Sequence, residues 1–205
     1  MLPEGVAEVA VAGETLWLLP QCAVFWPRTD TLLVADAHFG KAAAFRQGGI
    51  PVPTGTTGEN LGTLAALVTG CHARRIVFLG DLVHSAAGKR GADAAFTAWR
   101  AANAALELVL VRGNHDRHAG DPPREWNVTA VPEPFAAEGF ALCHAPGAVR
   151  GFYALAGHIH PSVTLYGRGR DHLRLPCFWF TETYAVLPYE PVNGESASAP
   201  HALDH

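Results

Sequence analysis

This chain contains five short clusters of aspartate, asparagine and histidine, and each begins where an apolar stretch ends. The preceding stretches are short and rich in valine, leucine and isoleucine, which predicts buried β-strands. Ligand sites of α/β proteins lie at the carboxyl ends of strands, so we expect the clusters to converge at one rim. The clusters are Asp36-Ala37-His38, Gly80-Asp81, Gly113-Asn114-His115-Asp116, His144 and Gly157-His158-Ile159-His160.

The apolar pattern predicts an α/β fold. Strands and helices alternate in the first half of the chain, whereas the second half is mostly strands, which favours two mixed β-sheets packed face to face and flanked by helices. The expected helices are Leu61–Val68 and Ala92–Ala105. The expected strands are Val6–Val11, Thr15–Leu18, Cys22–Trp26, Thr31–Ala35, Ile76–Leu79, Leu106–Val111, Asn127–Val131, Phe140–Cys143, Tyr153–Ala156, Val163–Tyr166 and Phe178–Thr181, the last running towards Val186.

Length and composition predict one cytoplasmic domain over residues 1–192, followed by a flexible tail over 193–205. The four cysteines show no disulfide spacing, and we expect Cys143 to pack in the core. The N-terminus does not resemble a signal peptide, and no apolar run reaches about 18 residues, so no membrane partner is expected. The net charge of −4 argues against a broad nucleic-acid footprint. Two bound divalent cations would neutralise it.

The chemistry of the clusters indicates a metal site. Carboxylate and amide oxygens together with imidazole nitrogens suit Mn²⁺, Fe²⁺, Zn²⁺ or Mg²⁺, and we expect Mn²⁺. An amide such as Asn114 is a poor ligand for a lone structural zinc ion. It is reasonable in a two-metal site, where one carboxylate bridges ions about 3.5–4 Å apart.

In this order, the motifs D-x-H, G-D, G-N-H-D, a lone histidine and G-H-x-H resemble those of the calcineurin-like metallophosphoesterase superfamily. Segments 35–53, 78–85 and 174–178 are further similar to the DNA ligase-associated metallophosphoesterases of bacteria. This resemblance implies a four-layer sandwich with two divalent metals. It also implies hydrolysis of phosphate diesters in DNA during repair, with a DNA ligase and a helicase as partners. The stretch after Phe178 departs from the family's usual ending.

The resemblance also implies a role for each polar residue. His115 would contact the substrate phosphate and protonate the leaving oxygen, and Asp116 would orient the His115 imidazole. The implied metal ligands are Asp36, His38 and His160 for one ion, Asn114, His144 and His158 for the other, and Asp81 as the bridge between them.

Three further residues are candidate substrate contacts. Arg46 lies in the loop after the first motif, Arg112 directly precedes the G-N-H-D turn, and His84 follows Asp81 by three residues. Each has a plainer interpretation, because loop arginines are commonly solvated and a histidine beside a turn commonly packs.

Other interpretations stay open at this stage. The substrate could be a small nucleotide rather than DNA, and the chain could be a non-catalytic scaffold in a repair assembly. Trp126 and Phe152 could stack on a base or belong to the core. Apolar residues near the termini are compatible with a homodimer.

Overall fold

The computed structural model describes residues 4–53, 55–168 and 171–189. The predicted tail, residues 193–205, lies outside these ranges. Within them, no helix combines the length and the apolar character needed to cross a membrane.

The described residues form a larger sheet of seven strands. Their order across the sheet is β1 (Ala7–Val11), β2 (Glu14–Leu19), β3 (Ala23–Trp26), β4 (Thr31–Ala35), β5 (Arg75–Leu79), β6 (Glu107–Val111) and β7 (Thr129–Val131). Strands β1 to β4 pair antiparallel, and β4 to β7 pair parallel. The parallel pairing places the carboxyl ends of β4, β5 and β6 at one edge of the sheet.

A smaller sheet of five strands also lies within the described ranges. Its order is β13 (Trp179–Phe180), β14 (Tyr184–Val186), β10 (Tyr153–Ala156), β9 (Phe140–Leu142) and β8 (Phe135–Ala137). Strands β14, β10 and β9 are parallel, and the two edge strands run antiparallel to their neighbours. The sequence predicted one final strand here, whereas the structure has β13 and β14.

Successive side chains of a strand point to opposite faces of the sheet, so a single apolar strand contributes to a hydrophobic core on each face. On β5, Val77 and Leu79 point into the core between the two sheets, where they join Phe140 and Leu155 of the smaller sheet. Ile76 and Phe78 point to the opposite face and join the residues of the covering helices. The larger sheet is therefore buried on both faces, which confirms the predicted pair of mixed sheets flanked by helices.

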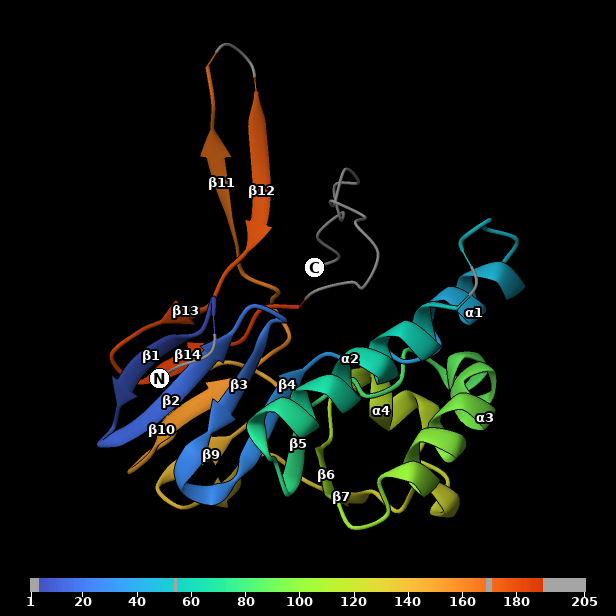
Figure 1. Cartoon of the computed structure of the whole chain (residues 1–205), viewed down its shortest axis with the longest axis horizontal. Helices are drawn as coiled ribbons and strands as arrows, with labels where there is room; N and C mark the ends of the chain where they lie inside the picture. The colour runs from blue at the N-terminus through green and yellow to red at the C-terminus, as the bar shows by residue number, and fades with distance from the viewer. Residues whose placement is uncertain (1–3, 54, 169–170, 190–205) are drawn as a thin grey trace.

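The helices gather on the outer face of the larger sheet (Figure 1). They are α1 (Lys41–Gln47), α2 (Thr56–Cys71), α3 (Ala86–Ala102) and α4 (Asn114–Ala119), with 3₁₀ turns at Pro27–Thr29 and Arg124–Trp126. The sequence predicted that α3 begins at Ala92, whereas it begins six residues earlier, at Ala86. The prediction was late because Gly88 and Gly91 lower the helix propensity of this turn. Both glycines lie against α1, Gly88 beside Gly40 and Gly91 beside Ala43, so close helix packing explains them.

One element projects from the sandwich (Figure 1). Strands β11 (Ser162–Tyr166) and β12 (His172–Pro176) pair antiparallel with each other, from Ser162 opposite Pro176 to Tyr166 opposite His172. The sequence predicted β11 but not β12. We call this hairpin, residues 162–176, the β-arm.

Candidate metal centre

The five polar clusters meet at the carboxyl ends of strands, as the sequence predicted. Asp36 directly follows β4, Asp81 lies two residues after the end of β5, and Asn114 opens α4 just after β6. His144 and His158 follow β9 and β10 of the smaller sheet. Both sheets therefore contribute residues to one site.

Among the described residues, two groups of side chains have potential ligand atoms within 4.8 Å of one another. Asn114 extends the second group, because its Oδ1 lies 2.8 Å from Nε2 of His144. The first group is Asp36, His38 and His160, and the second is Asp81, His144 and His158. This grouping fits a dinuclear metal centre, and the assignment of Asp81 as the bridge stays a prediction.

The burial of the carboxylates supports the fit to cations. Asp36 is fully buried and Asp81 is 3% exposed. The close ion-pair partners that the described residues give them are histidines: His144 and His160 for Asp36, and His144 and His115 for Asp81. Oδ1 of Asp36 has no hydrogen-bond partner among the described residues. Since a buried carboxylate needs compensating charge, this arrangement is what bound cations would complete.

Two histidines of the site, His38 and His158, have lowered pKa values that favour the neutral ring. Burial lowers the pKa of His38 to about 2, with nearby Lys41 adding to the effect. Burial also lowers the pKa of His158. A metal ligand must be a neutral imidazole, so no proton has to leave these rings at neutral pH.

The backbone of the ligands is strained. The φ angles of these residues are positive, between 45° and 75°, although non-glycine residues rarely adopt this region. Such conformations cost on the order of 1–3 kcal/mol each and persist where surrounding structure enforces them, commonly at functional sites. The residues are Asp36, His38, Asp81, His158 and His160.

Two motif glycines make room for ligands. Gly80 has φ +82°, and a Cβ there would collide with the His144 imidazole. A Cβ on Gly157 would meet Oδ2 of Asp36 and Cβ of Ala35. The glycines in G-D and G-H-x-H are thus required by close approach between the two sheets.

His115 is held beside the second group. Its backbone N–H donates to Oδ1 of Asp81 at 2.9 Å, and its Nδ1 lies 2.9 Å from the carbonyl oxygen of His84. Its Nε2 is 4.0 Å from Oδ2 of Asp81, and its side chain is 38% exposed. Nε2 is therefore the ring atom near the ligands.

Within the described residues, the hydrogen bonds of the Asp116 carboxylate are with the backbone, and the orienting role of Asp116 stays a prediction. Its carboxylate accepts from the backbone N–H of Gly113 at 2.9 Å and of Val83 at 3.4 Å. Asp116 therefore fixes the turn that opens α4, and the His84 carbonyl orients His115.

Comparison with known proteins agrees with this geometry. No model of a protein family matched the chain, and neither did any curated protein. Among solved structures, the crystal structure of Pseudomonas putida nuclease MPE matches at 37% sequence identity and a TM-score of 0.81. The match covers 97% of this chain and 94% of that one. The chain belongs to the metallophosphoesterase family. It is a metal-dependent phosphoesterase, as its motifs predicted.

His84 lies within this metallophosphoesterase site. Its ring stacks on that of His115, with centroids 5.1 Å apart, and contacts those of His38 and Phe45 edge-on. Burial lowers the pKa of His84 to about 4, with His115 and Lys41 adding to the effect. The uncharged ring of His84 therefore packs against the ring of His115. A contact between His84 and the substrate stays a prediction.

The two candidate arginines have protein partners. Arg112 forms a two-point ion pair with Asp121, with N–O distances of 2.7 and 2.9 Å. Arg46 donates to the carbonyls of Pro53 at 2.6 Å and Val52 at 3.4 Å. These bonds explain both arginines as loop anchors, and their contact with phosphate stays a prediction.

The aromatic and cysteine alternatives are partly decided. Trp126 is fully buried, stacks on Phe96 and donates to Asp93, so it cannot stack on a base. Phe152 is 40% exposed. Cys143 is buried in a small cluster on the smaller sheet, as predicted.

Sequence reasoning missed Glu133. Its carboxylate accepts from the backbone N–H of His144 at 2.8 Å and of Ala145 at 2.9 Å, and it pairs with Arg117. It therefore fixes the backbone of a metal ligand. A glutamate eleven residues before its partner gives no local signal.

Tyr189 was also missed. It lies in the stretch after Phe178, where the sequence departs from the family's usual ending. Its ring centroid is 4.7 Å from that of His160 and 5.5 Å from that of His38. Lys41 Nζ lies 5.2 Å from the same ring. The divergent ending thus lines the first ligand group.

Proposed function

We propose that this metallophosphoesterase is a two-metal nuclease that hydrolyses phosphodiesters in DNA, with Mn²⁺ as its metal. The observation that carries the proposal is the coincidence of two complete ligand groups with an exposed imidazole, His115, beside them. The similar Pseudomonas putida protein is a nuclease, which supports a nucleic-acid substrate.

The proposed ligand assignment follows the two groups, with Asn114 in the second and Asp81 as the bridge. When bound, two divalent cations supply positive charge for the phosphoryl oxygens and lower the pKa of water at the site. The buried imidazole of His38 and the exposed imidazole of His158, whose pKa values are both lowered, hold such ions without losing a proton first.

The protein's own acid is His115. Its Nδ1–H donates to the His84 carbonyl, so Nε2 is the ring atom left to carry the proton that is transferred. The carboxylate of Asp81 lies 4.0 Å from this Nε2. His115 gives this proton to the leaving oxygen as the P–O bond breaks, a role worth about 10²–10⁴-fold in rate.

A role in DNA repair, with a DNA ligase and a helicase as partners, is proposed from the family resemblance. Nothing in the geometry of the site opposes it.

The test uses metal-free protein to which Mn²⁺ is added back, with single-stranded DNA and an aryl phosphodiester as parallel substrates. We expect cleavage of both, and its loss in Asp81→Asn. Cleavage of the aryl ester alone would redirect the proposal to a small-nucleotide substrate. Metal binding without turnover, under every divalent ion tried, would favour the scaffold.

A further inference from the structure

The β-arm grows directly from the metal centre. Its first strand begins at Ser162, two residues after the ligand His160. Its base is closed by the N–H of Cys177, which donates to the Pro161 carbonyl at 3.0 Å. Since a strand rises about 3.3 Å per residue, Tyr166 lies roughly 20 Å along the chain from His160.

The register divides the arm into two unlike faces. Val163 pairs with Leu175, and Leu165 with Leu173, so one face is aliphatic. Thr164 pairs with Arg174, and Tyr166 with His172, so the opposite face is polar and aromatic. The polar face carries Thr164, Tyr166, His172 and Arg174, and Arg168 lies just beyond Tyr166.

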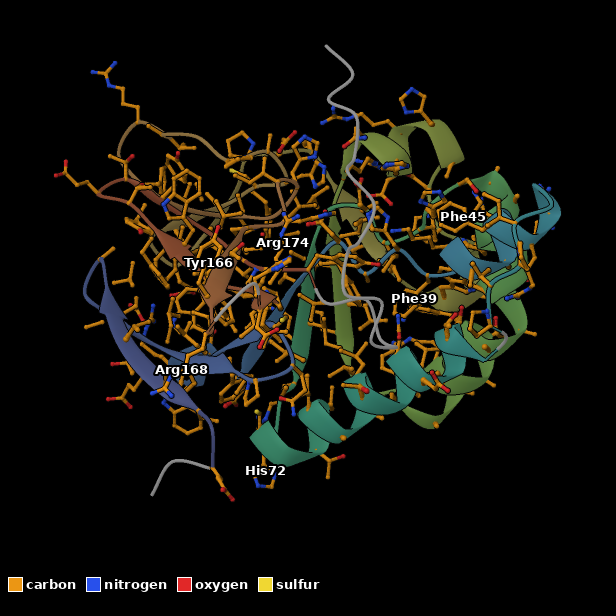
Figure 2. All side chains as sticks on the ribbon, turned by 90° about the horizontal axis from the view of Figure 1, so that it is seen from above. Phe39, Phe45, His72, Tyr166, Arg168 and Arg174 are labelled. Atoms are coloured by element: carbon orange, nitrogen blue, oxygen red, sulfur yellow. The ribbon has the colours of Figure 1, made fainter. Side chains whose placement is uncertain are left out.

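The position of the arm places it beside a substrate at the metals. In Figure 2, along the long axis of the molecule, Phe39 lies between Arg174 of the arm and Phe45 of α1. Phe39 directly follows the ligand His38. The base of the arm, where Cys177 bonds to Pro161, directly follows the ligand His160, so a chain bound at the metals would have the arm beside it.

The charge of the arm is opposite to that of the whole protein. The chain has a net charge of −4, yet the described part of the arm contains Arg168 and Arg174 against the single acid Asp171. The Arg174 Nε donates to Ser162 Oγ at 2.6 Å, which fixes the guanidinium over the polar face. Positive charge fixed beside a phosphodiesterase site is complementary to a phosphate backbone.

The exposure of Tyr166 is the second feature of a binding face. Its side chain is 84% exposed at the outer end of β11. An aromatic ring flanked by arginines is the combination that binds single-stranded nucleic acid, because the ring stacks on any base while the cations follow the backbone.

We propose that the polar face of the β-arm guides a single strand of nucleic acid into the metal centre, with Tyr166 stacking on a base and Arg174 contacting a phosphate. This inference rests on the proposed nuclease function. Tyr166 and Arg174 are positioning residues that act on substrate remote from the scissile bond.

The test compares two matched double variants of the Mn²⁺-loaded protein. Tyr166→Ala with Arg174→Ala alters the polar face, and Leu165→Thr with Leu173→Thr alters the aliphatic face while keeping strand-forming residues. Each is assayed on single-stranded DNA and on an aryl diester too small to reach the arm. Binding of a labelled oligonucleotide is measured separately with His115→Ala added, so that cleavage is slowed.

We expect the polar-face variant to raise the oligonucleotide Kd and the KM for DNA by about tenfold or more, with aryl-diester turnover unchanged. Its plot of log Kd against log salt should be shallower by about 0.7, the contribution of one single-strand phosphate contact. The aliphatic-face variant should match the wild type. Unchanged turnover of the aryl diester also shows that both variants fold.

Two results would overturn the arm's role. One is wild-type DNA binding by the polar-face variant. The other is loss of DNA binding in the aliphatic-face variant together with a halved mass in light scattering, which would make the arm an interface between two copies of the chain. If the wild type cleaves only the aryl diester, the nuclease function fails, yet the oligonucleotide Kd values still decide whether the arm binds a strand.

Discussion

The Nδ1 of His115 lies 2.9 Å from the carbonyl oxygen of His84, so the turn after β5 orients the ring that follows β6. This bond assigns a proton to Nδ1 and leaves Nε2 facing the metal centre. In the proposed reaction, two strand-end motifs thereby contribute to one proton transfer.

His115→Ala should lower kcat for DNA by about 10²–10⁴-fold, because the leaving alkoxide then departs without a proton. An aryl diester should lose far less, because an aryl oxide is a better leaving group. Steady-state kinetics on both substrates measures the difference. Equal losses on the two would argue that His115 binds the phosphate instead of donating a proton.

Removal of metal should lower the melting temperature. Bound ions stabilise the native state by RT ln(1 + [L]/Kd), which is about 2.7 kcal/mol at a hundredfold excess over Kd. Thermal unfolding with chelator and then with added Mn²⁺ tests this, and Asp36→Asn with Asp81→Asn is the control that should respond weakly. A melting temperature that is indifferent to Mn²⁺ in the wild type would count against the assigned ligands.

Glu133→Gln should weaken metal binding by about 10–100-fold, the range typical of residues that hold a ligand in place. The amide keeps the shape but loses the charge that accepts two backbone N–H groups and pairs with Arg117. Calorimetric titration with Mn²⁺ measures the effect. Glu138→Gln, at an exposed site, is the matched control and should bind like the wild type.

Gly80→Ala should destabilise the protein more than Gly139→Ala. Both glycines have positive φ, so both variants carry backbone strain. Only at Gly80 does the new methyl group also collide with the His144 imidazole, whereas the space around Gly139 is open. Chemical denaturation should show the larger loss for Gly80→Ala, together with weaker Mn²⁺ binding. Similar losses in both variants would contradict the packing argument.

Arg112→Ala separates a structural role from substrate binding. The Arg112 hydrogen bond holds the pKa of Asp121 below its ordinary value of 3.8. The pair therefore stabilises the fold above about pH 4, and this contribution is lost as pH falls through the lowered pKa. Because both side chains are partly exposed, we expect about 0–1 kcal/mol at neutral pH. Chemical denaturation at pH 7 and near pH 3 measures this stability, and steady-state kinetics on DNA is measured in parallel. A raised KM for DNA at unchanged stability would instead make Arg112 a phosphate contact.

Local sequence determined the ingredients of the site. Apolar runs predicted β4, β5, β6, β9 and β10, and the polar residues at their ends predicted the ligands, because strand formation and ligand chemistry are both encoded within a few residues. The same reasoning did not identify Glu133 and Tyr189. Neither residue lies in a motif, and each contacts residues that are distant in sequence.

The tertiary structure decided what those ingredients do together. Packing of the two sheets brings His144 and His158 against Asp36 and Asp81, which no single segment could arrange. The same packing sets the Asp116 carboxylate against the backbone of the turn, and it sets the His84 carbonyl against the ring of His115. The sequence therefore determined which chemistry is present, whereas long-range packing decided which atom faces which, because directional contacts form only when distant segments are fixed in one fold.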